Sequence, residues 1–156
     1  MHIAIVGAGY VGLVSAACFA EFGVDVWLLD SDASKITALR EGRIPIYEPG
    51  LDRLVADNAR DGRLHFCDTL EEAMAGADAV FLAVGTPSRR GDGHADLSYV
   101  FAAAEQVARA AQGPLTLVTK STVPVGTGAK IAALVRAIRP DISAVSYTHL
   151  TLPTKA

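Results

Sequence analysis

The sequence predicts an α/β fold, a doubly wound parallel sheet with helices on both faces in a single domain. Short apolar runs alternate with helical patterns along the chain, which is typical of a parallel sheet and not of a helix bundle or a β-sandwich. A glycine-rich turn separates the first apolar run from the first helical pattern. A chain of 156 residues can bury one core of ordinary size, so we expect no second full domain within it.

The composition excludes several classes of partner. The chain has 14 Lys and Arg against 17 Asp and Glu, and no cluster of basic residues. Nucleic acids and anionic membranes select for concentrated positive charge, so we expect neither as a partner. The two cysteines, Cys18 and Cys67, are too few for a disulfide scaffold. We expect both to be reduced, as in a cytoplasmic protein.

The chain begins with a long uncharged stretch, residues 3–20, which has the length of a membrane span or signal peptide. No Lys or Arg precedes it, and three glycines interrupt it. We therefore predict a buried strand at residues 2–6, a glycine turn, and a helix at residues 11–22 closed by Gly23.

The following elements continue the alternation. Asp32 or Ser31 can cap the second helix, and Asp96 can cap the helix that follows the predicted strand at residues 79–84. Pro140 ends the last helix. We expect the alanine-rich part of the Asp96 helix to serve packing alone. The predicted strands are residues 24–29, 64–66, 79–84 and 115–119, and the predicted helices end near residues 40, 60, 75, 111 and 138.

The glycine turn has the spacing of a dinucleotide-binding motif. Gly7, Gly9 and Gly12 directly follow a predicted strand and open a predicted helix. In such a turn the first glycine makes the bend, the second lets the backbone approach a pyrophosphate, and the third lets the helix pack closely. The helix N-terminus then faces the anion with its N–H groups. The pattern predicts a Rossmann-like nucleotide site.

An acidic residue at the end of the second predicted strand supports the same site. Asp30 lies 18 residues after Gly12, close to the roughly 20 residues expected for the carboxylate that binds a ribose 2′-hydroxyl. A carboxylate there repels a 2′-phosphate, so the sequence favours NAD over NADP. The alternative interpretation of Asp30 is a helix cap, and the two roles are compatible.

Polar residues also follow two other strands, at the edge where doubly wound sheets bind ligands. Residues 84–87 end one strand, and Lys120, Ser121 and Thr122 end the next. These segments are either part of the ligand site or ordinary turns in which the hydroxyl of Thr86, Ser121 or Thr122 bonds its own backbone.

Several longer motifs together resemble the UDP-glucose/GDP-mannose dehydrogenase family. They extend over residues 1–142. The specific pieces are IYEPGL and KSTVP, which other dinucleotide-binding proteins have no reason to carry at these positions. The motifs are GAGYVGL, Asp30 with Lys35, IYEPGL, VGTP, ADLSYV and KSTVPVGT.

The resemblance implies an NAD-dependent enzyme that oxidises UDP-glucose to UDP-glucuronate by two hydride transfers, through a cysteine thioester. Separately, His94 and His149 have no ligand-spaced partners in the sequence, so we predict no metal site. The resemblance also implies that Thr122 assists catalysis by positioning a water or proton relay. The implied cofactor-binding residues are Gly7, Gly9, Tyr10, Val11, Gly12, Asp30, Lys35, Val84, Gly85, Thr86, Pro87, Ser121 and Thr122.

The same resemblance implies that the oxidation reaction requires segments that this sequence lacks. Family members carry a glutamate-bearing NPEFLREG-like segment and later a GGxCFPKD-like segment with the nucleophilic cysteine, and neither Cys18 nor Cys67 matches that position. We therefore expect the chain to be inactive alone. We expect the full-length form to bind a nucleotide sugar and to be a homo-oligomer.

The last residues differ from the family pattern. We expect an NAD-binding domain at residues 1–144 and an atypical tail at residues 145–156 that is foreign to the gene or disordered. The alternative is a natural, divergent tail.

Other functions remain open. One is a stand-alone NAD-sensing module without catalysis, and another is a family member that acts on GDP-mannose or an N-acetylated UDP-sugar. A third is a different dehydrogenase of the same fold. The IYEPGL and KSTVP motifs count against the first and the third.

Overall fold

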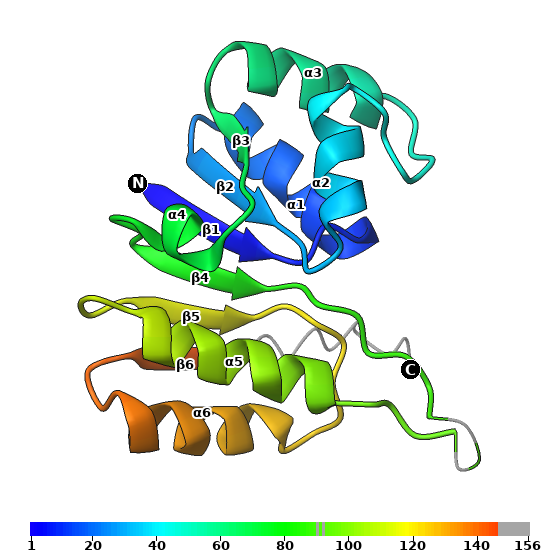
Figure 1. Cartoon of the computed structure of the whole chain (residues 1–156). Coiled ribbons are helices and arrows are strands. Elements are labelled where there is room, and N and C mark those ends of the chain that lie inside the picture. The colour runs from blue at the N-terminus through cyan, green and yellow to red at the C-terminus, as the bar shows by residue number, and fades with distance from the viewer. Residues whose placement is uncertain (90, 92, 147–156) are drawn as a thin grey trace, which may run out of the picture.

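The chain forms one six-stranded parallel sheet. The computed structural model describes residues 1–89, 91 and 93–146. The strands lie in the order β3-β2-β1-β4-β5-β6, which Figure 1 shows from top to bottom, and each neighbouring pair is parallel. The strands are β1 (His2–Val6), β2 (Asp25–Leu29), β3 (Leu64–Phe66), β4 (Ala79–Leu82), β5 (Thr116–Thr119) and β6 (Ser143–Ser146).

Helices cover both faces of the sheet, as the sequence predicts. One apolar core lies beneath α1 (Tyr10–Glu21), α2 (Ala33–Arg40) and α3 (Leu51–Arg60). A second core lies beneath α4 (Leu70–Met74), α5 (Ser98–Ala110) and α6 (Thr127–Ile138). No helix in the described part of the chain combines the length and the hydropathy needed to span a membrane.

The uncharged start of the chain is explained by the central position of β1. Ile3 and Ile5 point into the core under α1, while Ala4 between them points into the opposite core. All three are almost fully buried. A strand covered on both faces needs apolar residues at successive positions, so the run reads as continuous and not as alternating.

The predicted elements are present, with shifts at their ends. β1, α3 and β3 have the predicted bounds, whereas α1 begins one residue early, at Tyr10, and ends at Glu21. β4 ends at Leu82, two residues before its predicted end. The Leu82 carbonyl accepts hydrogen bonds from the N–H groups of Lys120 and Ser121, at 2.8 and 3.0 Å. The Ala83 N–H still donates to the Val6 carbonyl at 2.8 Å, but the paired residues of both neighbouring strands end opposite Leu82, at Val6 and Thr119.

The end of the described chain crosses the predicted boundary at residue 144. β6 pairs with β5 in parallel, and the pairs include Val118 with Val145 and Thr119 with Ser146. The rest of the predicted tail, residues 147–156, lies outside the described residues. The boundary itself therefore stays a prediction.

Candidate functional site

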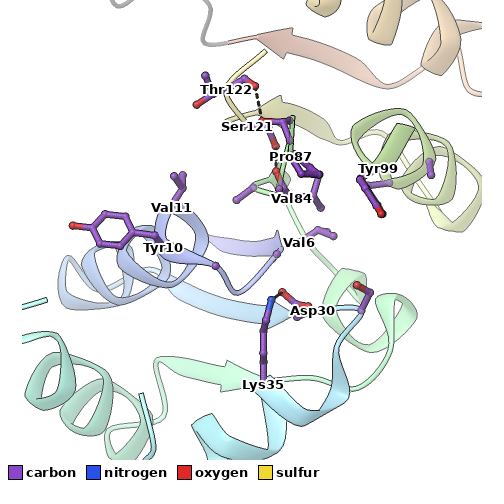
Figure 2. Close-up of a pocket in the computed structure, with 18 of the residues that line it drawn as sticks. Val6, Tyr10, Val11, Asp30, Lys35, Val84, Pro87, Tyr99, Ser121 and Thr122 are labelled. Atoms are coloured by element: carbon purple, nitrogen blue, oxygen red, sulfur yellow. Dashed lines mark hydrogen bonds and ion pairs between the residues drawn. The ribbon is translucent and has the colours of Figure 1, made fainter. Parts of the chain in front are cut away.

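A pocket of about 660 Å³ lies at the carboxyl ends of β1, β2, β4 and β5. Every cofactor-binding residue that the resemblance implies, except Gly12, lines it, whereas Lys120 does not. Figure 2 shows Asp30 and Lys35 on one side of the glycine turn, with Ser121 and Thr122 on the other. The lining residues are Val6, Gly7, Gly9, Tyr10, Val11, Asp30, Ser31, Lys35, Ala83, Val84, Gly85, Thr86, Pro87, Tyr99, Ala102, Ala103, Gln106, Ser121 and Thr122.

Two glycines of the turn are required by close backbone packing. Gly7 has φ +111°, and a Cβ there would lie 2.5 Å from the Ala83 carbonyl oxygen. A Cβ on Gly12 would lie 1.7 Å from the Gly7 carbonyl oxygen. Gly12 is buried behind the turn, where it lets α1 approach the strands closely.

The middle glycine of the turn, Gly9, leaves open space at the start of α1. It occupies the N-cap position with φ −77°, and no heavy atom lies within 4 Å of a Cβ built on it. No side chain caps the first N–H groups of the helix. Open space, N–H donors and the positive end of the helix dipole together suit a pyrophosphate, so the turn fits a dinucleotide.

Asp30 is anchored by the backbone on both sides. Its side chain is only 9% exposed, and Oδ2 accepts a hydrogen bond from the Ala8 N–H at 2.7 Å. Oδ1 accepts from the Asp32 N–H at 2.9 Å, and the Lys35 ammonium lies 3.5 Å from Oδ2. The carboxylate is thus held between the glycine turn and the start of α2, with one cation beside it.

The helix-cap role considered for Asp30 belongs to Asp32. The Asp32 carboxylate accepts hydrogen bonds from the hydroxyl and the backbone N–H of Ser34, at 2.5 and 3.0 Å. The hydroxyl bond, followed by the N–H bond, lowers the pKa of Asp32. Asp30 therefore does not need to cap α2, and its position on the pocket wall is compatible with ribose binding.

The hydroxyls at the other side of the pocket connect two loops. Ser121 donates to the Val84 carbonyl at 2.8 Å, and Thr86 donates to the Thr122 carbonyl at 3.0 Å. These two hydroxyls therefore do not bond their own turns, as the ordinary-turn alternative expects, but join the loops that follow β4 and β5. The Thr122 side chain remains exposed at the pocket.

The IYEPGL segment lies against the start of α1. The Tyr10 hydroxyl donates a hydrogen bond to the Glu48 carboxylate. This bond is the main reason that the pKa of Tyr10 is raised. Sequence reasoning could not place Glu48, because a contact across 38 residues leaves no local pattern.

One wall of the pocket was not predicted from the sequence. Tyr99, Ala102, Ala103 and Gln106 of α5 line it, so the interpretation of this helix as packing alone was wrong. Their positions follow the spacing i, i+3, i+4, i+7, which marks one face of a helix. That spacing, directly after the VGTP loop, is the signal that could have identified them.

The two cysteines are free and lie away from the pocket lining. Cys67 is fully buried. Its burial is the largest cause that raises the pKa of its thiol to about 12. A thiol in that state is a poor nucleophile, because the thiolate is the reactive form.

Comparison with known proteins agrees with this geometry. Residues 1–149 match the model of the "UDP-glucose/GDP-mannose dehydrogenase family, NAD binding domain". A UDP-glucose 6-dehydrogenase of Rhizobium meliloti is 60% identical over 148 residues, which are 94% of this chain and 34% of that protein. One of Pseudomonas aeruginosa is 47% identical over 136 residues, 87% of this chain and 30% of that protein. The chain thus spans about a third of the length of these relatives.

Solved structures agree as well. A UDP-glucose dehydrogenase from Pyrobaculum islandicum superposes with a TM-score of 0.84 at 42% identity, over 93% of this chain and 34% of that chain. The GDP-mannose dehydrogenase of Pseudomonas aeruginosa superposes with a TM-score of 0.87 at 32% identity, over 94% and 35%. The present chain therefore belongs to the UDP-glucose/GDP-mannose dehydrogenase family and contains the family's NAD-binding domain, as these matches, the Rossmann-like sheet and the glycine turn show.

Proposed function

We propose that this chain is the NAD-binding part of a UDP-glucose 6-dehydrogenase, whose full-length form oxidises UDP-glucose to UDP-glucuronate by two hydride transfers to NAD. The observation that carries the proposal is the single pocket in which the glycine turn, Asp30 and the KSTVP segment meet. The 60% identity to a protein named UDP-glucose 6-dehydrogenase favours UDP-glucose over GDP-mannose as the substrate.

Different residues of the pocket bind different parts of the dinucleotide. The start of α1 at Gly9 binds the pyrophosphate with its N–H groups. Asp30 accepts a hydrogen bond from the adenosine ribose, and Ser121 and Thr122 lie on the nicotinamide side of the turn. NAD bound in this way supplies the hydride acceptor. Asp30 also repels a 2′-phosphate, which sets the preference for NAD.

Thr122 assists the reaction in this proposal. Its backbone carbonyl is held by the Thr86 hydroxyl, so its position relative to the loop after β4 is defined. Its own hydroxyl is exposed at the pocket. A hydroxyl both donates and accepts a hydrogen bond, so Thr122 orients a water or passes a proton beside the reacting carbon.

The covalent step belongs to other parts of the full-length enzyme. The buried thiol of Cys67 is unsuited to attack, and Cys18 lies on α1 outside the pocket. We therefore propose that this chain binds NAD but does not oxidise UDP-glucose alone. In the full-length form the partners are a nucleotide sugar and further copies of the same protein, and the location is the cytoplasm.

Two measurements on the purified chain test the proposal. Equilibrium dialysis is expected to show saturable binding of NAD, and failure to bind NAD would contradict the function. Incubation with NAD and UDP-glucose is expected to give no rise in absorbance at the NADH wavelength. A steady rise would overturn the proposed inactivity while leaving the dehydrogenase function in place. Repeating the assay on the full-length enzyme with UDP-glucose, GDP-mannose and N-acetylated UDP-sugars decides the substrate.

A further inference from the structure

A smaller pocket lies at the β3 edge of the sheet, away from the NAD site. It has a volume of about 350 Å³ and is bordered by the end of α2, by α3 and by β3. Both helices contact β3, and Figure 1 shows the three elements together at the upper end of the sheet. No residue lines both pockets, so a ligand in the smaller one does not occupy the NAD site. The lining residues are Leu39, Arg40, Gly42, Ile44, Asp52, Val55, Ala56, Ala59, Leu64 and Phe66.

The buried side of the smaller pocket is apolar. Leu39, Val55 and Leu64 line it, and each is only 2% exposed. All three belong to the apolar cluster beneath α1, α2 and α3. The two alanines of α3 that line the pocket leave space beside them, because their side chains are small. These residues therefore suit a short carbon chain, which gains free energy when it leaves water.

The charge of Arg40, the basic residue in this lining, is already paired within the protein. Its Nη1 and Nη2 atoms each donate to a carboxylate oxygen of Asp68 at 2.9 Å. Nη2 also donates to the Phe66 carbonyl at 2.8 Å. The bonds to Asp68 are the main reason that the pKa of Arg40 is raised. An anionic ligand would have to displace Asp68 from the guanidinium, so the smaller pocket does not suit an anion.

Asp52 brings a negative charge to the same pocket. It lies in the first turn of α3, and its side chain is exposed at the pocket. Asp57 on the same helix forms ion pairs with Arg53 and Arg60, whereas Asp52 forms none within the described part of the chain. The C-terminal end of α2 borders the pocket at Gly42, and the negative end of a helix dipole favours a cation. The exposed side of the pocket therefore suits a positive charge.

We propose that the smaller pocket binds a small organic ammonium ion. The apolar residues contact its carbon chain, and the Asp52 carboxylate pairs with its ammonium group. A neutral apolar molecule leaves this carboxylate without a partner, and an anion is repelled by it. The volume of about 350 Å³ is at the lower end for ligand sites, which suits a small amine and not a dinucleotide. The inference does not depend on the proposed function, because it concerns a different site.

Titration of the isotope-labelled chain, followed by the NMR signals of its backbone amides, tests the proposal. The probes are hexylammonium, hexanol and hexanoate, which share one carbon chain and differ in charge. Hexylammonium is expected to shift the signals of residues 39–44, 52–59 and 64–66 saturably. Hexanol is expected to bind about fivefold more weakly, because the ion pair is lost, and hexanoate not to bind. No saturable shift with hexylammonium, or equal affinity for either other probe, would overturn the proposal.

Two variants and a matched control test the assigned residues. Asp52→Asn is expected to bind hexylammonium about fivefold more weakly and hexanol as before, because only the charge is removed. Ala56→Leu fills the pocket and is expected to weaken both probes. Asp61→Asn removes the same charge at the other end of α3, outside the lining, and is expected to leave both affinities unchanged. Thermal denaturation shows whether each variant is folded. Equal losses in folded Asp52→Asn and Asp61→Asn would overturn the pairing with Asp52.

Discussion

Single residues at the glycine turn have separable tasks. Gly12 has no space for a Cβ, because the Gly7 carbonyl oxygen would lie 1.7 Å from it. Gly9 has ample space and an ordinary φ of −77°. Gly12 therefore serves the packing of α1, and Gly9 keeps the space for the ligand free.

Alanine at each position separates the two tasks. Gly12→Ala forces α1 away from the strands and is expected to lower the free energy of unfolding by about 2 kcal/mol or more, as overpacking does. Gly9→Ala is expected to unfold at the same denaturant concentration as the unaltered chain but to lose NAD affinity, because its methyl group occupies the pyrophosphate space. Urea unfolding and NAD titration measure both effects. Equal stability of the two variants would contradict this division.

Asp30 and Lys35 together predict the cofactor preference. In Asp30→Asn the negative charge is removed, while an oxygen remains to accept the Ala8 N–H. The Lys35 ammonium, 40% exposed, loses its partner and becomes available to a 2′-phosphate. We expect the preference for NAD over NADP to fall about tenfold or more in binding assays. The double variant Asp30→Asn with Lys35→Met is the control, and it is expected to bind NADP less well than Asp30→Asn alone.

At the scale of elements, the start of α2 is stabilised by an ionised side chain. Asp32 accepts two hydrogen bonds from Ser34, which lower its pKa below the ordinary value. A carboxyl with a lowered pKa in the folded state stabilises the fold when the pH is above its unfolded-state pKa, about 3.9. That stability is lost as the pH falls through the lower folded-state value.

The comparison of the unaltered chain with Asp32→Asn tests this cap. The unaltered chain is expected to melt at the higher temperature at pH 7, and the difference is expected to shrink as the pH falls below about 4. Circular dichroism melts at several pH values measure it. A difference that is constant from pH 7 to pH 3 would show that the charge of Asp32 does not stabilise α2.

How far the elements could be predicted depends on the range of the interactions that define them. Local apolar periodicity predicted the ends of α3 and β3 to the residue, because the residues that define each element lie within the element itself. The end of β4 was misplaced because its apolar run continues to Val84, whereas the pairing ends opposite Leu82, at Val6 of β1 and Thr119 of β5. The wall of α5 was missed although the spacing of Tyr99, Ala102, Ala103 and Gln106 marks one helix face, since its alanines fit a core as well as a ligand site.

At the scale of the whole molecule, the site lies where the winding of the sheet reverses. β1 pairs with β2 on one side and with β4 on the other, so the connections diverge at their carboxyl ends. The pocket therefore takes residues from both halves of the fold. This much of the site could be predicted from sequence, because the glycine spacing and Asp30 are tied to the fold itself.

A second pocket allows the location of the ligand to be tested. It has a volume of about 350 Å³ and lies between α2, α3 and β3, with Arg40, Asp52 and Phe66 in its lining. It lacks the glycine turn and the residues that follow β4 and β5. A ligand in that pocket would contact a different set of backbone segments.

Hydrogen–deuterium exchange of the chain with and without NAD tests the central claim most directly. NAD is expected to slow exchange in residues 7–13, 30–35, 84–87 and 98–106 together, because these segments border the larger pocket. Residues 51–66, beside the smaller pocket, are expected to exchange unchanged. Slowed exchange confined to residues 51–66, or no change in residues 7–13 at saturating NAD, would contradict the account.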